Sequence, residues 1–97
     1  MISMLLNELS TNATKYGAWS NGSGRVEISW TVQSDQFKFQ WAEHDGPTIQ
    51  KPADRSFGSR LIEEILPSAL HAKASASYDP NGFVFKLEGP SVALTAN

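Results

Sequence analysis

The chain has 97 residues, which is the length of one small domain and excludes a multidomain enzyme within this sequence. Its 8 lysine and arginine residues against 10 aspartate and glutamate residues give a formal charge of −2, so the basic excess expected of a nucleic-acid-binding protein is missing. It has no cysteine, which excludes disulfides and thiolate zinc sites, so apolar side chains must form the core. No apolar run reaches the roughly 18 residues needed to span a bilayer and no signal peptide opens the chain, so we expect a cytoplasmic module without a membrane segment.

The first half of the sequence predicts a helix followed by a β-hairpin. Residues 1–17 carry apolar side chains at helical intervals and end in a glycine that stops the helix. Residues 18–24 are rich in serine, asparagine and glycine, which predicts a loop. Apolar and polar residues alternate over 25–32 and 37–42, which predicts two antiparallel strands with a turn at residues 34 and 35. We expect the apolar face of this hairpin to supply most of the core.

The second half predicts a long loop, a short helix and a second hairpin. Residues 45–56 contain glycine and proline and fit neither periodicity. Residues 59–66 predict a helix that ends at or soon after Pro67. Residues 73–78 and 83–87 predict two strands joined by a turn.

The order of these elements predicts an α+β fold. Its simplest packing is a two-layer sandwich with both helices on one face of a mostly antiparallel four-stranded sheet. We expect this domain to cover residues 1–90, and residues 91–97 to form a flexible tail. Composition and periodicity do not assign a function, because they are compatible with many functions.

One group of candidate functional residues lies on the first predicted helix. Glu8 and Asn12 are one helical turn apart, and Lys15 continues the same side of the helix. A row of this kind is also typical of a solvated polar face, so the spacing alone does not assign a site.

Two further groups lie at the ends of predicted elements. Glu43 leaves the second strand just before the turn-forming residues 45–47, where binding sites often lie but where a strand also commonly ends in polar residues. The stretch of residues 55–60 leads into the second helix, whose free N–H groups could hold phosphate oxygens. Plain capping of the helix by Ser56 or Ser59 explains the same residues.

Together, the order and the residues of these segments resemble the ATP-binding domain of sensor histidine kinases. This domain is the Bergerat or GHKL type of HATPase domain. The stretch from Asn7 to Ala18 resembles the N-box of these domains. Trp41-Ala42-Glu43, followed by Asp45-Gly46-Pro47, resembles the first glycine box of the HWE subfamily, and residues 57–62 resemble its second glycine box. The resemblance covers residues 5–90 and is that of an N-terminally truncated domain of the HWE type.

This resemblance implies a site for ATP and Mg²⁺ between the helices and a lid formed by residues 45–56. Asn12 would bind Mg²⁺, Glu8 would polarise the attacking group, and Lys15 would be a second catalytic residue near the phosphates. Glu43 would accept a hydrogen bond from the adenine amino group. The other ATP-binding residues that the resemblance implies are Asp45, Gly46, Phe57, Gly58, Ser59 and Arg60.

The function implied is that of the catalytic domain of a two-component sensor histidine kinase, an enzyme that donates the γ-phosphoryl group of ATP to a histidine. That histidine would come from a dimerisation domain on another segment or chain, and a response regulator would be a further partner. Asn7 stands where the subfamily has histidine, and Asp45 and Ser56 stand where it has glycine. These departures keep an alternative open, namely a degenerate, non-catalytic module that docks a response regulator or a phosphotransfer partner. An isolated ATPase or a protein-serine kinase on the same fold is a weaker alternative.

The resemblance also predicts exposed apolar surface. In the family, a helix and a strand precede the N-box, whereas this sequence begins almost within it. With less of the sheet covered, we expect the chain to self-associate as a homo-oligomer at an edge of the sheet.

Overall fold

The described part of the chain forms helix, hairpin, helix and hairpin in that order. The computed structural model describes residues 2–47, 60–79 and 82–92. Its elements are α1 (Ile2–Lys15), β1 (Arg25–Gln33), β2 (Gln36–His44), η1 (Leu61–Ile65), α3 (Leu66–Ala69), β3 (Lys73–Asp79) and β4 (Gly82–Pro90). Each strand predicted from the alternation of residues is present, and β4 is longer than predicted at both ends. The residues of the predicted tail beyond 92 lie outside the described residues.

The four strands form one antiparallel sheet in the order β1-β2-β4-β3. The turn between β1 and β2 lies at Ser34 and Asp35, whose φ angles of 50° and 65° are those of a two-residue turn that matches the twist of a hairpin. The two hairpins meet where β2 pairs with β4, with Trp41 opposite Phe85. The sheet therefore joins the two halves of the chain through its central strands.

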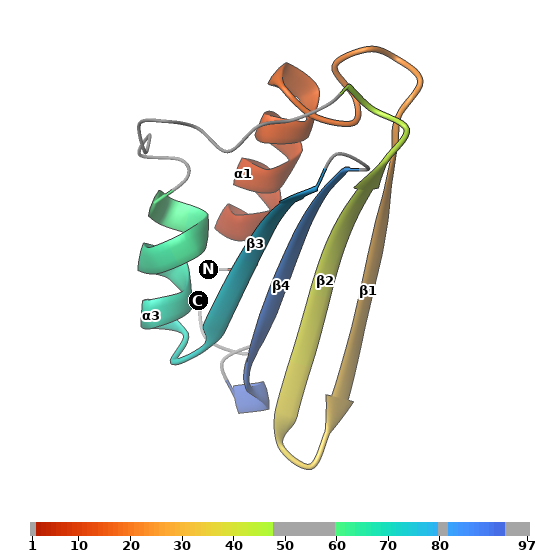
Figure 1. Cartoon of the computed structure of the whole chain (residues 1–97). Helices are drawn as coiled ribbons and strands as arrows, with labels where there is room; N and C mark the ends of the chain where they lie inside the picture. The colour runs from red at the N-terminus through yellow and green to blue at the C-terminus, as the bar shows by residue number, and fades with distance from the viewer. Residues whose placement is uncertain (1, 48–59, 80–81, 93–97) are drawn as a thin grey trace.

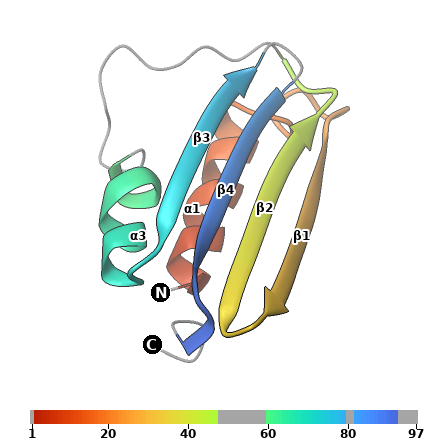
Figure 2. The same cartoon turned by 60° about the horizontal axis from the view of Figure 1, so that its bottom comes forward.

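Both helical segments lie on the same face of this sheet (Figures 1 and 2). The predicted two-layer α+β sandwich is confirmed. Buried apolar side chains of α1, β2, η1, α3 and β4 form the core between the layers, together with Leu70. The largest fully buried side chains are those of Trp41, Phe37, Phe85, Leu5, Leu9, Ile62, Leu70 and Leu87.

The prediction that the first hairpin supplies most of the core is wrong for β1. The apolar side chains of β1 share a face with the buried residues of β2, because Ile28 pairs with Trp41 and Val32 pairs with Phe37. Ile28, Trp30 and Val32 are nevertheless 44%, 68% and 54% exposed. The physical reason is visible in Figure 1, where β1 is the edge strand furthest from α3. The described helices therefore cover β2, β4 and β3 and leave the apolar face of β1 open from Ile28 to Val32, whereas Val26 packs against the core.

The second helix ends soon after Pro67, as predicted. The helix continues through α3 to Ala69, and Pro67 lies within the first two positions of α3. The preceding turn, η1, is a π-helix in which the Leu66 amide bonds to the Leu61 carbonyl. Proline is tolerated in the first turn of an α-helix because its missing N–H has no partner to lose there. The change of helix type in front of Pro67 gives it such a position.

None of the helices in residues 2–47, 60–79 and 82–92 is both long enough and apolar enough to cross a membrane.

Candidate functional site

The polar row predicted on the first helix lies at the margin of the buried side of α1. Leu5, Leu9 and Ala13 make up the buried stripe of this helix. Glu8 and Asn12 are half-buried beside that stripe, and Lys15 is exposed in the last turn. Within the described residues, none of these three side chains takes part in a hydrogen bond or ion pair, so their polar atoms are available to a ligand.

Glu43, the residue predicted to bind the adenine amino group, is the one buried charged side chain in the described part of the chain, with 4% exposure. It stands near the end of β2 on the face that carries the helices, opposite Val26. Its Oε1 atom accepts a hydrogen bond from the Ala18 amide at 2.9 Å, and its Oε2 atom accepts one from the Trp41 indole nitrogen at 2.8 Å. Buried carboxylates need such donors, because an unpaired charge in the interior is very unfavourable.

The bond from Ala18 brings Glu43 to the C-terminal end of α1. The helix ends where the Gly17 amide bonds both to Asn12 and to Ala13, at 3.1 and 3.2 Å, and Ala18 follows directly. Asn12 lies about 4.5 Å along the helix axis before the last helical residue, Lys15. The C-terminal half of α1 and the end of β2 therefore bring Asn12, Lys15 and Glu43 to one end of the fold.

Gly46 lies against the same loop. A Cβ atom added at Gly46 would lie 2.6 Å from the Cα atom of Ala18, which is closer than real Cβ atoms come. Glycine at this position therefore allows the chain after β2 to pass over the loop after α1. Its approach to an adenine base remains a prediction.

Asp45 stands at the position where the resembled family has glycine, and the backbone explains how it is accommodated. Its φ angle is 60°, in the left-handed region that glycine adopts freely. Aspartate tolerates this region better than most residues. Its carboxylate is exposed and lies 3.6 Å from the Arg25 guanidinium, an ion pair that contributes little at the surface. Asp45 therefore adopts a backbone conformation that glycine at this position would adopt without strain.

We expect Asp45→Ala to lower the free energy of unfolding by about 1 kcal/mol, because alanine disfavours the left-handed conformation. Asp45→Gly should leave this free energy within about 0.5 kcal/mol of the starting value. Both variants lose the ion pair with Arg25 equally, so their difference isolates the backbone term. Urea denaturation of the wild-type chain and the two variants measures the free energy of unfolding. Equal stability of the two variants would contradict a left-handed backbone conformation at residue 45.

The predicted phosphate-side segment is only partly described. Phe57, Gly58 and Ser59 lie outside the described residues. Arg60 directly precedes η1 and is exposed, with its Nε atom 3.4 Å from the Glu64 carboxylate one turn later. This ion pair does not test a phosphate-binding role for Arg60, which stays a prediction.

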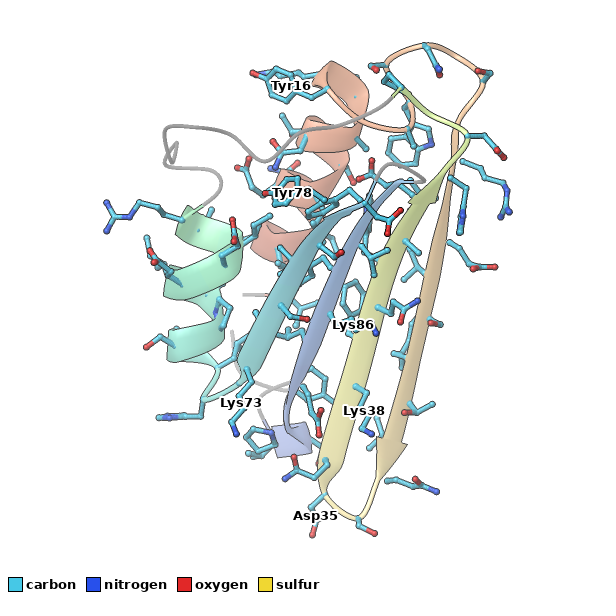
Figure 3. All side chains as sticks on the ribbon, viewed as in Figure 1. Tyr16, Asp35, Lys38, Lys73, Tyr78 and Lys86 are labelled. Carbon is cyan, nitrogen blue, oxygen red and sulfur yellow. The ribbon has the colours of Figure 1, made fainter. Side chains whose placement is uncertain are left out.

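A concavity lined by described residues lies on the other face of the sheet. It has a volume of about 490 Å³ and contains none of the predicted site residues. Lys38, Lys73 and Lys86 reach it from three neighbouring strands, as Figure 3 shows. This concavity is not the proposed nucleotide site, because it lies on the opposite face of the sheet from Glu43 and α1.

The residues present fit a magnesium ion bound together with a phosphate ligand. No group of three or more histidine, aspartate or glutamate side chains that could hold a metal occurs within 2–47, 60–79 and 82–92. Mg²⁺ commonly takes one or two protein oxygens and fills its octahedron with water and phosphate oxygens. The amide oxygen of Asn12, on the open margin of α1, is a donor of this kind.

Two hydrogen bonds of this site were missed by sequence reasoning. Ala18 contributes only its backbone amide, which no residue pattern reveals. The strand that carries Phe39 and Trp41 was expected to provide a dry, fixed pocket for the Glu43 carboxylate; Trp41 is buried, and its indole also donates to Glu43. The spacing of two residues between Trp41 and Glu43 was a signal for this contact, because such residues point to the same face of a strand.

Known histidine kinases are similar to this chain in sequence. The chain is 41% identical over 96 residues to a blue-light-activated histidine kinase of Brucella anthropi, a match that covers 95% of this chain and 20% of that protein. It is 38% identical over 93 residues to the protein of the same name in Brucella ovis, covering 92% of this chain and 19% of that protein. The chain thus spans about a fifth of the length of these curated relatives. No family model matches it.

A solved structure gives the same result for the fold. The histidine kinase domain of the Erythrobacter litoralis EL346 blue-light activated histidine kinase superposes with a TM-score of 0.76 at 25% identity. The match covers 94% of this chain and 43% of that domain. The resemblance to histidine kinases that the motifs predicted is confirmed. By sequence and by fold, the chain is similar to histidine kinases, and its fold matches part of a histidine kinase domain.

Proposed function

We propose that this chain is the ATP-binding, catalytic part of a two-component sensor histidine kinase, and that it donates the γ-phosphoryl group of ATP to a histidine on another segment or chain. One observation carries the proposal. The hydrogen bond between the Ala18 amide and Glu43 joins the end of β2 to the end of α1, so that a buried acceptor lies beside a helix margin bearing Glu8, Asn12 and Lys15.

Each of these residues has a role in the proposed site. Asn12 holds Mg²⁺, which when bound neutralises charge on the phosphates. Lys15 adds a cation near the phosphates, and Glu8 polarises the attacking histidine. Phosphoryl transfer depends mainly on positioning and on charge stabilisation, so an amide, an ammonium and a carboxylate are a sufficient set.

The base would be held at the other end of the site. Glu43 accepts a hydrogen bond from the amino group of adenine, and Asp45 and Gly46 lead the backbone past the base. Phe57, Gly58, Ser59 and Arg60 would contact the phosphates from the start of the second helix. The loop between these two groups would close over the nucleotide.

The phosphoacceptor histidine belongs to a partner in this proposal. The chain has two histidines, His44 at the end of β2 and His71 after α3. Neither stands in a segment that resembles a phosphoacceptor helix. A dimerisation domain that carries the acceptor, and a response regulator that receives the phosphoryl group, are therefore the proposed protein partners.

Transfer in trans tests this function directly. The chain is incubated with γ-labelled ATP, Mg²⁺ and the isolated acceptor-histidine domain of one of the Brucella relatives. We expect label on the acceptor that is stable to base and labile to acid, as phosphohistidine is. A folded chain that binds ATP and yields no label would contradict the catalytic role.

The second candidate function is docking without catalysis. It is favoured by the concavity on the outer face of the sheet, where Lys38, Lys73 and Lys86 gather and would suit an acidic protein surface. Retention of Glu8, Asn12 and Glu43 argues against this alternative. If the chain binds an acidic response regulator with the same affinity with and without ATP, and transfers no label, docking is the better description.

Self-association through β1 is a further part of the proposal. β1 is an edge strand of the sheet, and an antiparallel pairing of two copies centred on Ser29 would place Ile28 opposite Trp30 on the open apolar face. We expect Trp30→Lys to weaken this association roughly tenfold to a hundredfold, because burial of a large apolar side chain is lost and an edge lysine resists pairing.

Sedimentation velocity over a wide range of concentrations measures this association. Tyr16→Lys is the matched control, since Tyr16 is also 68% exposed but lies at the end of α1. A wild-type chain that stays monomeric throughout would contradict this proposal.

A further inference from the structure

The carboxylate of Glu43 is held from two sides by neutral donors. The Ala18 amide occupies Oε1 and the Trp41 indole N–H occupies Oε2, at 2.9 and 2.8 Å. A carboxylate offers about four lone-pair positions, so these two bonds fix its plane and leave one position on each oxygen for a ligand. No cation in the described residues forms an ion pair with Glu43. Either of the two remaining positions therefore suits an N–H donor, such as an exocyclic amino group.

The geometry of a strand explains why the donor is a tryptophan two residues away. Side chains at i and i+2 point to the same face and are separated by about 7 Å along the strand. Trp41 and Glu43 both face the helices, as their pairing with Ile28 and Val26 requires. The indole ring is long enough to span this separation and carries an N–H at its edge, whereas phenylalanine has no donor.

The indole itself is held in place. Trp41 is 1% exposed, and the ring of Trp19 packs edge-on against it with 5.9 Å between ring centres. The backbone at Trp19 is tied to α1 because its amide donates to the Ala13 carbonyl at 3.0 Å. Because Trp41 belongs to the buried core, its indole cannot turn away from Glu43 without disturbing the packing between α1 and the sheet.

Gly17 closes the remaining side of the carboxylate. A Cβ atom added at this position would collide with the Glu43 Oε1 atom. The backbone at the end of α1 thus lies directly over the carboxylate, which restricts the directions from which a ligand reaches it.

We propose that Trp41 is a positioning residue for base recognition, which orients the Glu43 carboxylate to accept a hydrogen bond from the 6-amino group of an adenine nucleotide. This inference rests on the proposed function, and it adds that the Trp-x-Glu spacing supplies specificity for the base rather than core packing alone.

Trp41→Phe tests the inference, because it removes the N–H donor and keeps an aromatic side chain. Binding is measured by calorimetry with ATP and with purine riboside triphosphate, which lacks the 6-amino group, both in the presence of Mg²⁺. We expect the wild-type chain to prefer ATP. In Trp41→Phe, ATP affinity should fall about tenfold while affinity for purine riboside triphosphate changes little, because a charge-assisted hydrogen bond is weakened.

Trp19→Phe is the matched control. It makes the same replacement in the ring that touches Trp41, but Trp19 has no hydrogen bond to Glu43, so the ratio of the two affinities should stay unchanged. Equal weakening of both nucleotides in Trp41→Phe would overturn the inference and leave the proposed function standing. A wild-type chain that binds the two nucleotides equally would overturn the inference and the proposed role of Glu43, and would leave the rest of the proposed function standing. A folded wild-type chain that binds neither nucleotide would contradict the proposed function and this inference together.

If Trp41→Phe does not fold, the resonances of the indole N–H protons in the wild-type chain test the inference instead. The chain has three tryptophans, and Trp30, 68% exposed, serves as an internal reference for rapid hydrogen exchange. We expect the Trp41 indole proton to exchange slowly and its resonance to shift with ATP but not with purine riboside triphosphate. Exchange as rapid as that of Trp30, or the same shift with both nucleotides, would overturn the inference.

Discussion

Replacing Asn12 by alanine is expected to abolish Mg²⁺-dependent nucleotide binding, with a loss of about a hundredfold or more in affinity. Even residues that only support metal ligands change metal affinity ten- to hundredfold, so removal of a ligand should cost at least as much. The Asn12 side chain has no hydrogen-bond partner among the described residues and the residue is only half-buried, so the fold should survive the change. Calorimetry with and without Mg²⁺ measures the effect, and the thermal transition of the variant reports its folding.

Asn7→Ala is the matched control for this prediction. It removes the same amide from the same helix, but Asn7 is exposed and points away from the buried stripe of α1. We expect its Mg²⁺-dependent binding to equal that of the wild-type chain. Unchanged binding in Asn12→Ala, or an equal loss in both variants, would refute the assignment of Asn12.

Replacing Glu8 by glutamine should separate binding from transfer. The change keeps the shape of the side chain and removes its ability to polarise an attacking histidine. General-base assistance of this kind contributes typically 10²- to 10⁴-fold, so transfer to the acceptor domain should fall by about that factor while ATP affinity stays within about twofold. The labelled transfer assay and calorimetry measure the two quantities separately.

Glu88→Gln controls for the loss of one negative charge. Glu88 stands on β4 opposite Lys38 and Lys73, on the face of the sheet away from α1. Its replacement should leave transfer unchanged. Normal transfer in Glu8→Gln would remove Glu8 from the proposed mechanism, whereas a parallel loss in both variants would point to an effect of overall charge.

The local elements of the fold could be predicted because short-range periodicity records them. Alternation of apolar residues gave all four strands, and helical spacing gave α1. The end of the second helix soon after Pro67 could be predicted from the proline itself. Here a π-helical turn precedes Pro67, and residue pattern alone does not reveal such a change of helix type.

The exposure of β1 could not be predicted from its pattern. Alternation at Val26, Ile28, Trp30 and Val32 identifies one apolar face, but it does not say whether a helix covers that face. Coverage depends on where the helices pack, which is set by contacts between distant parts of the chain. In this chain the helices pack against β2, β4 and β3, and the face of β1 stays open at Ile28, Trp30 and Val32.

In the candidate site, too, the sequence motifs could be predicted, whereas a contact between distant parts of the chain could not. The motifs pointed to Glu43, Asn12 and Glu8 by their order along the chain. They did not reveal that the amide of Ala18, 25 residues before Glu43, completes the surroundings of its carboxylate. Such a contact exists only once α1 and β2 have packed against each other.

The most direct test of this account is titration of the purified chain with ATP, with and without Mg²⁺. The account predicts saturable binding that depends on Mg²⁺, because Asn12 supplies only one oxygen and the phosphates complete the metal site. Binding of one nucleotide per chain in the presence of Mg²⁺, and much weaker binding in its absence, is the expected result. A folded chain that binds no nucleotide under either condition would contradict the central claim that α1 and the end of β2 form an ATP site.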